Sequence, residues 1–177
     1  MNIEGFANYK YDTDFLDFAK QFDVIGLCET WGSNHTDFDG TLHNYEHFDY
    51  IRKRSRHARR SSGGGSVVVK NYLVSSGNVK RIFDNMNDCV VLLFSGGMLN
   101  IAHDIIMIFA YISPENSPVY NEQDTNGIEL LNNQISEIVS QFPTADIFLA
   151  GDLNTVVSNC SLIIFHMTRL ITYLMIM

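Results

Sequence analysis

The sequence has few cysteines, and none has the spacing of a structural metal site or a disulfide scaffold. The three cysteines of the 177-residue chain, Cys28, Cys89 and Cys160, lie far apart and are odd in number. They include no Cys-X-X-Cys or cysteine–histidine pair with zinc-binding spacing, so a zinc fold and a disulfide-stabilised fold are both disfavoured. Cys28 and Cys89 adjoin strongly apolar runs, and we expect both to be buried, reduced thiols.

Basic residues are also scarce, and they are unevenly placed. The chain has 12 Lys and Arg residues against 20 Asp and Glu residues, which gives a net charge of −8. A protein that holds nucleic acid by its phosphates is usually basic, so the total speaks against that class. However, half of the basic residues lie between Arg52 and Arg60. This stretch is either a solvated loop or a phosphate-contacting loop. Its candidate nucleic-acid-binding residues are Arg52, Arg54, Arg56, Arg59 and Arg60.

The N-terminal fifteen residues are polar and lack the apolar stretch of a secretory signal peptide. This favours an intracellular setting, nuclear or cytoplasmic. The strongly apolar stretch lies at the other end, at Ser161–Met177, and His166 and Arg169 interrupt it. It is too short and too interrupted to predict a membrane span. We favour an aberrant C-terminus, from read-through or a shifted frame, over a membrane anchor.

Strands are expected to outnumber helices. Hydrophobic residues make up 46% of the chain and charged residues 18%, as in a globular domain with a core. Short apolar runs without alternation are typical of strands covered on both faces. Such runs occupy residues 23–28, 66–70, 90–94, 105–111 and 146–150. Two further strands are expected at 48–52 and at 99–102, the latter after a Ser-Gly-Gly turn.

Two helices complete the expected pattern. Residues 12–22 form the first, because four apolar side chains share one helical face: Phe15, Phe18, Ala19 and Phe22. The second is capped by Asp124 or Thr125 and ended by Pro143. Strands in hairpins, with a helix before two of the buried strands, predict the α/β class: a two-sheet β-sandwich flanked by helices.

Polar side chains follow the buried strand at 146–150. Asp152 and Asn154 are two residues apart, so on an extended segment they point to the same side. Gly151 would let the backbone turn there without a clash. A carboxylate can orient or deprotonate a water, and a carboxamide can hold a phosphate oxygen without adding negative charge. An ordinary turn is the alternative for an isolated Gly-Asp pair.

Glu29 and Tyr111 also stand at the ends of predicted strands, where ligand sites on sheet proteins gather. Mg²⁺ keeps much of its hydration and needs few protein ligands, so a single Glu suits it. A phenol could donate a hydrogen bond to a developing phosphorane oxygen. The alternatives are a solvated loop acid and a tyrosine at the rim of the sheet. Polar groups at three strand ends together favour a site.

Five segments in one order resemble the endonuclease/exonuclease/phosphatase superfamily, which has the DNase-I-like fold. They are NIEGF at 2–6, DVIGLCETW at 23–31, GGGSVVV at 63–69, FAYISPENS at 109–117 and LAGDLN at 149–154. The sequences of these segments are most similar to the endonuclease domain of non-LTR retrotransposons, whose nearest relation is the apurinic-endonuclease-like branch. The resemblance runs from residue 2 to about residue 157.

The resemblance implies a four-layer fold and Mg²⁺-dependent hydrolysis of a phosphodiester, with DNA as the partner and no small-molecule cofactor. It implies that Asn2 and Glu29 hold the metal. It also implies that Asp152 aligns or activates the nucleophile, that Asn154 contacts the scissile phosphate, and that Tyr111 lines the site.

The chain departs from the family's pattern after Asn154. Family members continue with more strands and a C-terminal Ser-Asp-His-type motif, and His166 has no neighbouring Asp to match it. We therefore expect residues 1–157 to be an incomplete domain, inactive or weakly active, and residues 158–177 to be an aberrant apolar tail. Two alternatives stay open: a non-catalytic interaction or membrane-associated fragment, and a phosphoinositide or sphingolipid phosphodiesterase of the same fold.

Overall fold

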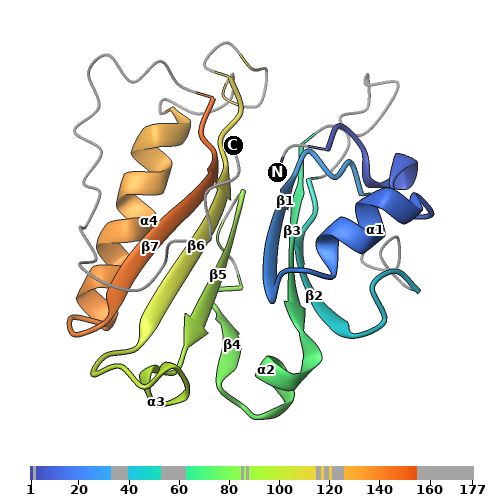
Figure 1. Cartoon of the computed structure of the whole chain (residues 1–177). Helices are drawn as coiled ribbons and strands as arrows, with labels where there is room; N and C mark the ends of the chain where they lie inside the picture. Colours follow the sequence, from blue (N-terminus) through green and yellow to red (C-terminus); the bar gives the residue numbers. More distant parts are fainter. Residues whose placement is uncertain are drawn as a thin grey trace.

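Two sheets packed face to face, with helices outside them, form the protein (Figure 1). The computed structural model describes residues 1, 3–32, 40–52, 63–84, 86, 88–114, 117, 120 and 126–154. Within them the predicted fold class, an α/β two-sheet sandwich with flanking helices, is confirmed.

The first sheet has three strands in the order β1-β3-β2, and both pairings are antiparallel. Its strands are β1 (Val24–Cys28), β2 (Tyr45–Tyr50) and β3 (Gly65–Lys70). Valines 67–69 of the central strand β3 are almost completely buried, as expected for a β-branched run covered on both faces.

The second sheet has four strands in the order β4-β5-β6-β7. They are β4 (Val79–Ile82), β5 (Cys89–Phe94), β6 (Ile105–Tyr111) and β7 (Asp146–Asp152). The pair β6–β7 is parallel, and the helix α4 (Gly127–Gln141) lies between the two strands in the chain, as a parallel connection requires.

Side chains cap the first and the longest helix at their N-termini. The carboxylate of Asp12 accepts hydrogen bonds from the amides of Asp14 and Phe15 at the start of α1 (Thr13–Ala19). Helix α4 is capped by Asn126, whose side chain accepts from the Glu129 amide at 3.0 Å. The predicted cap at Asp124 or Thr125 is thus displaced by one or two residues, and both lie outside the described residues.

The strand predicted at 99–102 is wrong. Residues Gly96–Leu99 form a short helix, α3, and Asn100 ends it in the left-handed conformation with φ 54°. The Gly96 amide donates to Asp104 Oδ1 at 2.8 Å, which closes the turn before β6 begins. Two further elements were not predicted from the sequence. Strand β4 has a weak apolar pattern, because Lys80 and Arg81 interrupt it. Helix α2 (Asn71–Ser75) has only five residues.

Alternating side chains divide the second sheet between two cores. On β6, Met107, Phe109 and Tyr111 face the first sheet, while Ile106 and Ile108 pack under α4. The outer face of the first sheet is covered by α1 and the N-terminal segment (Figure 1). The molecule therefore has four layers, and the alternation directs Tyr111 into the space between the sheets.

Cys28 and Cys89 are buried free thiols, as predicted. Among the described residues, no helix is long and apolar enough to cross a membrane.

Candidate active site

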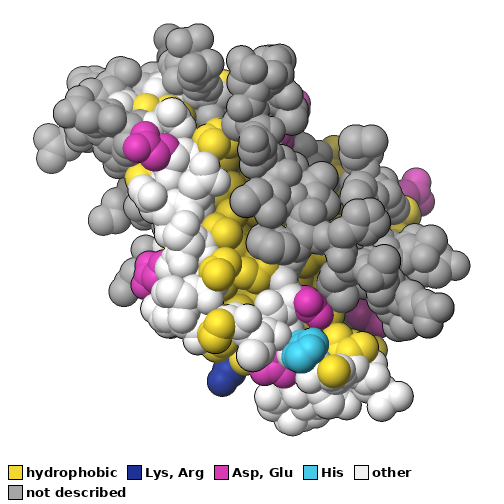
Figure 2. Space-filling view, turned by 90° about the vertical axis from the view of Figure 1, so that its left-hand side faces the viewer, with side chains coloured by type: hydrophobic (Ala, Val, Ile, Leu, Met, Phe, Trp, Pro, Cys, Tyr) yellow, Lys and Arg dark blue, Asp and Glu magenta, His cyan; other side chains and the backbone are white. Residues whose placement is uncertain are grey.

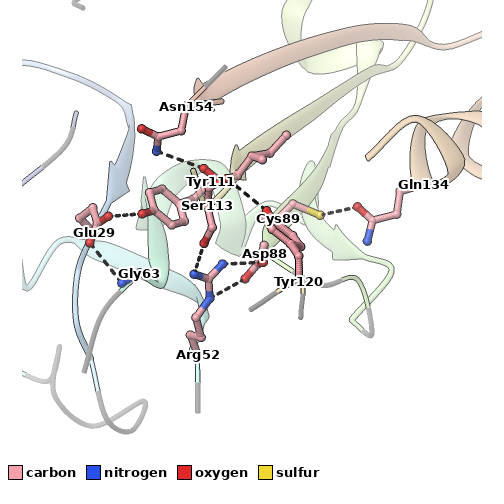
Figure 3. Close-up of polar contacts among 11 residues, drawn as sticks. Glu29, Arg52, Gly63, Asp88, Cys89, Tyr111, Ser113, Tyr120, Gln134 and Asn154 are labelled. Carbon is pink, nitrogen blue, oxygen red and sulfur yellow. Dashed lines mark hydrogen bonds and ion pairs between the residues drawn. The ribbon is translucent and has the colours of Figure 1, made fainter. Parts of the chain in front are cut away.

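The ends of β1, β6 and β7 bring three of the predicted site residues to one end of the sandwich. Tyr111 and Asp152 are partners in the register of the parallel pair β6–β7. The alternation that turns Phe148 and Ala150 inward also turns Asp152 inward. Glu29 follows β1 in the opposite sheet and meets the Tyr111 hydroxyl (Figure 3).

Three donors hold the carboxylate of Glu29. The Tyr111 hydroxyl donates to Oε1, while the Trp31 indole N–H and the Gly63 amide donate to Oε2 at 2.6 and 3.1 Å. Burial alone would raise the pKa of Glu29. The hydrogen bonds from Tyr111, Trp31 and Gly63, with the charge of Arg52, outweigh burial and lower the pKa below its ordinary value. Glu29 is therefore ionised at neutral pH.

The backbone around Glu29 is strained. Glu29 and Trp31 have φ angles of 58° and 53°, a left-handed conformation that few residues other than glycine adopt. Backbone hydrogen bonds hold it in place: the Trp31 amide donates to the Gly63 carbonyl at 3.0 Å, and the Phe6 amide donates to the Thr30 carbonyl at 2.9 Å. This strained turn aims both the carboxylate and the indole into the site.

Tyr111 is a protonated donor. Its side chain is 4% exposed, and burial, followed by its hydrogen bond to the Glu29 carboxylate, raises its pKa. The negative charge of Asp152 acts on Tyr111 in the same direction. Both predicted acids, Glu29 and Asp152, are thus close enough to influence one phenol.

Arg52 joins the two sheets beside this phenol. Its guanidinium pairs with Asp88 through two contacts, Nε to Oδ1 at 3.1 Å and Nη2 to Oδ2 at 2.5 Å, and also donates to the Ser113 hydroxyl. It lies over the Tyr111 ring, 5.2 Å from the centroid (Figure 3). Arg52 follows β2, whereas the other three residues belong to the second sheet or its ends. The guanidinium of Arg52 is thus held by Asp88 and Ser113 of the same chain.

The other predicted basic residues, Arg54, Arg56, Arg59 and Arg60, lie outside the described residues, and their contact with nucleic acid stays a prediction. Asn2 lies outside them as well. Its neighbours in the chain pair with the end of β1: the Met1 carbonyl accepts from the Cys28 amide at 2.8 Å, and the Ile3 amide donates to the Cys28 carbonyl at 3.1 Å.

Asp152 and Asn154 form a small turn at the end of β7. The Asn154 amide donates to Asp152 Oδ1 at 3.2 Å, and its side-chain Nδ2 donates to the Ile112 carbonyl at 3.1 Å. Gly151 has φ +133°, and a Cβ there would lie 1.8 Å from the Ala110 carbonyl oxygen. The expected need for glycine at this position is confirmed. Asp152 remains half-buried and Asn154 exposed.

The donors present suit a hydrated cation better than a fully protein-bound one. No group of three or more His, Cys, Asp or Glu side chains that could hold an ion occurs in the described part of the chain. Mg²⁺ needs only one or two carboxylates, with water and substrate oxygens completing its shell. The ionised Glu29 fits that requirement, with Asp152 as the second nearby carboxylate.

Sequence reasoning missed Trp31, Asp88 and Ser113. Trp31 had a signal, since it is the single tryptophan of the chain and lies two residues after the predicted ligand Glu29. Asp88 and Ser113 had none, because only the packing of the two sheets brings them to Arg52.

Residues 1–159 match the sequence model of the Endonuclease/Exonuclease/phosphatase family. The chain belongs to this family. The resemblance inferred from the five segments is thereby confirmed at the level of the superfamily, while the nearer likeness to retrotransposon endonucleases stays a prediction. No curated protein sequence matches the chain.

Solved structures with the family's fold are similar to the chain but longer. The AP endonuclease LMAP from Leishmania major has a TM-score of 0.65 at 15% identity, over 87% of this chain and 54% of that one. The 3′ phosphatase NExo from Neisseria, bound to product DNA hairpin, has 0.56 at 12% identity, over 86% and 55%. The human nocturnin catalytic domain with bound sulfate has 0.52 at 13% identity, over 89% and 63%. The family member described here thus spans roughly half the length of the structures it matches.

Proposed function

We propose that this site is a metal-dependent phosphodiesterase centre for DNA, which in the present chain binds Mg²⁺ but turns over weakly or not at all. The observation that carries the proposal is the Glu29 carboxylate, ionised at neutral pH and held by three donors beside Tyr111 and Asp152. An acid fixed in this way is prepared to bind a cation, because little side-chain freedom remains to be lost.

Each residue has a role in that reaction. Glu29, with Asn2, would hold the metal, which when bound supplies charge stabilisation to the phosphate. Asp152 would orient the attacking water from its half-buried position at the end of β7. Asn154 would contact the scissile phosphate, and the protonated Tyr111 lines the site as a hydrogen-bond donor.

We attribute weak turnover to the kinds of titratable side chain at the site. At this end of the sandwich the pKa of Glu29 is lowered, and the pKa values of Tyr111, Arg52 and Cys28 are raised. Shifted in these directions, none of these four pKa values suits a group that moves protons near neutral pH. The Ser-Asp-His-type motif that the resemblance leads us to expect is not in the sequence. We therefore propose that this chain by itself turns over weakly or not at all, and that it derives from a retroelement endonuclease.

DNA is the substrate that the similar structures favour. One of them is an AP endonuclease, and another is a 3′ phosphatase bound to a product DNA hairpin. We propose, from the polar N-terminal residues, that the protein acts in the nucleus or cytoplasm. The alternatives are a phosphoinositide or sphingolipid head group, and a non-catalytic interaction module that need not bind metal at Glu29.

The lone tryptophan offers a direct test. Trp31 donates to Glu29, so its fluorescence should change saturably as Mg²⁺ is titrated in the millimolar range. The variant Glu29→Gln should lose the response. Glu46→Gln, an exposed acid on β2, should keep it. Absence of any response in the wild-type chain would refute the metal site and favour an interaction module.

A second measurement addresses turnover. Nicking of supercoiled plasmid in Mg²⁺ should be absent or barely above background. Robust nicking that disappears in Asp152→Ala would show that the chain is an active nuclease and that the proposed inactivity is wrong. Hydrolysis of a phosphoinositide instead of DNA would support the lipid alternative.

A further inference from the structure

Strands β1 and β7 are edge strands of their sheets and lie on the same side of the sandwich (Figure 1). Within the described residues β7 pairs only with β6, and β1 pairs with β3 and, near its end, with Met1 and Ile3. All seven residues of β6 are buried, whereas Ile147–Ala150 of β7 are only partly buried. Apolar strands with a free edge are a liability that proteins normally cover.

A cavity of about 540 Å³ runs between these two edges and helix α1. Its walls are mainly apolar, and we call it the β1–β7 groove. It is lined, among others, by Phe18, Phe22, Ile25, Phe148, Ala150 and Leu153. Phe18 belongs to the apolar face of α1 and packs edge-on against Phe22, yet it is 40% exposed.

Two buried hydroxyls also line this groove. Tyr50 is 9% exposed and Ser66 1% exposed, and neither hydroxyl has a hydrogen-bond partner among the described residues. Buried polar groups are nearly always paired, so an occupant that offers peptide groups suits the groove better than a purely hydrocarbon one. Apolar exposure continues on the outer side of β7. Ile147 and Leu149 are partly buried beside α4 there, and Figure 2 shows a band of hydrophobic side chains on that face.

We propose that the β1–β7 groove is the docking site of the chain's own C-terminal segment, Ser161–Met177. Leu153 lines the groove, and only residues 154–160 separate Leu153 from Ser161 in the sequence. A seven-residue link spans up to about 23 Å when extended. The five residues of β1 extend over about 17 Å, so the chain can reverse and return along the groove.

The composition of the segment matches the groove. Arg169 is its only Asp, Glu, Lys or Arg residue, and the rest is rich in Leu, Ile, Met and Phe. Burying such side chains is favourable by about 25 cal/mol per Å² of apolar surface. The covalent link gives the segment an effective concentration in the millimolar range, well above that of a second molecule in dilute solution. Docking within the chain is therefore favoured over pairing between copies.

The test uses the full chain with a photo-crosslinking benzoylphenylalanine in place of Phe18. The expected product joins residue 18 to a peptide from Ser161–Met177 of the same molecule, in a chain that sizing shows to be monomeric. The matched control carries the same group in place of Tyr72, an aromatic residue that is 60% exposed on α2 and outside the groove. It should give no such product.

Three results would overturn the proposal. Crosslinks between two molecules would show that a second copy fills the groove. Loss of the intramolecular product on adding phosphatidylcholine vesicles would show that the segment prefers a membrane. Absence of any product with the segment would show that it does not dock.

A double substitution tests whether apolar contact makes the segment dock. Ile171→Asp with Leu174→Asp places charge in the segment, and should abolish the crosslink and raise the fluorescence of a hydrophobic dye several-fold. Asn159→Asp, in the linking residues, should change neither. An unchanged crosslink in the double variant would contradict docking through apolar contact. Neither experiment uses metal or DNA, so its result is independent of the proposed function.

Discussion

Glu29 is the residue on which the electrostatics of the site depend. Its carboxylate receives an indole, a phenol and a backbone amide, all within a strained turn. These donors bind the charged form, which is why they lower the pKa of Glu29 in spite of partial burial.

The ionisation of Glu29 should make the stability of the fold depend on pH. The pKa of Glu29 is lower in the folded than in the unfolded chain, so its stabilising contribution is fully present above the unfolded pKa, about 4.3. It is lost as pH falls through the folded pKa. Trp31 fluorescence and urea stability followed from pH 7 to pH 3 should report this loss in the wild type and in Glu46→Gln. In Glu29→Gln the acid-range change in the tryptophan signal should be absent, and its persistence would assign the titration to another group.

The Tyr111 hydroxyl should stabilise the fold through its hydrogen bond to Glu29. Tyr111→Phe keeps the ring over which Arg52 lies but removes the donor to Glu29. Loss of a hydrogen bond to a charged acceptor should destabilise the fold by about 1–3 kcal/mol in urea unfolding. It should also move the acid transition of Trp31 fluorescence to higher pH. Tyr72→Phe, at a 60% exposed position, should change stability by less than about 0.5 kcal/mol.

At the scale of elements, the two sheets are joined at the site by Arg52 and Asp88, whose side chains are 14% and 27% exposed. Arg52→Met removes the cation and leaves Asp88 without this bidentate partner, which should cost about 2–4 kcal/mol. The exposed pair Lys20–Asp17, at 62% and 74%, is the matched control, and Lys20→Met should cost no more than about 1 kcal/mol. Equal losses in urea unfolding would show that Arg52 does not join the sheets.

The pairing of β6 with β7 depends on Gly151. In Gly151→Ala the new methyl would overlap the Ala110 carbonyl, so the strands must separate at the site end, and we expect a loss of more than about 3 kcal/mol. Gly77 also has positive φ, +74°, but a Cβ there meets nothing within 4 Å. Gly77→Ala should therefore cost only the backbone strain, about 1 kcal/mol. Similar thermal shifts in the two variants would contradict the steric argument.

At the scale of the whole molecule, metal binding should stabilise the fold. A ligand at tenfold its dissociation constant adds about 1.4 kcal/mol, which raises the Tm of a chain of this length by roughly 3–5 °C. Millimolar Mg²⁺ should produce this shift in differential scanning calorimetry, and a chelator should reverse it. The Glu29→Gln variant should show no shift. An equal shift in the variant would indicate a non-specific salt effect.

Some elements of the fold were predictable from the sequence, and others were not. The buried strands at 24–28, 65–70, 89–94, 105–111 and 146–152 were predictable, because unbroken apolar runs have few other ways to fold. Strand β4 was not, since its burial comes from pairing with β5 rather than from its own composition. The 99–102 prediction failed because the Gly96–Asp104 contact, which closes the turn as α3, leaves no periodic signal.

For the site, the sequence by itself determined the residue types at the strand ends, Glu29, Tyr111 and Asp152, together with the order of segments that marks the family. Only the tertiary structure decided their partners. Tyr111 and Gly63 donate to Glu29, and Asp88 holds Arg52 across the sheets, because contacts between residues up to 82 positions apart depend on sheet packing. Strand periodicity is a local property of the chain, whereas the electrostatics of a site are set by whatever the fold brings within a few ångströms of each charge.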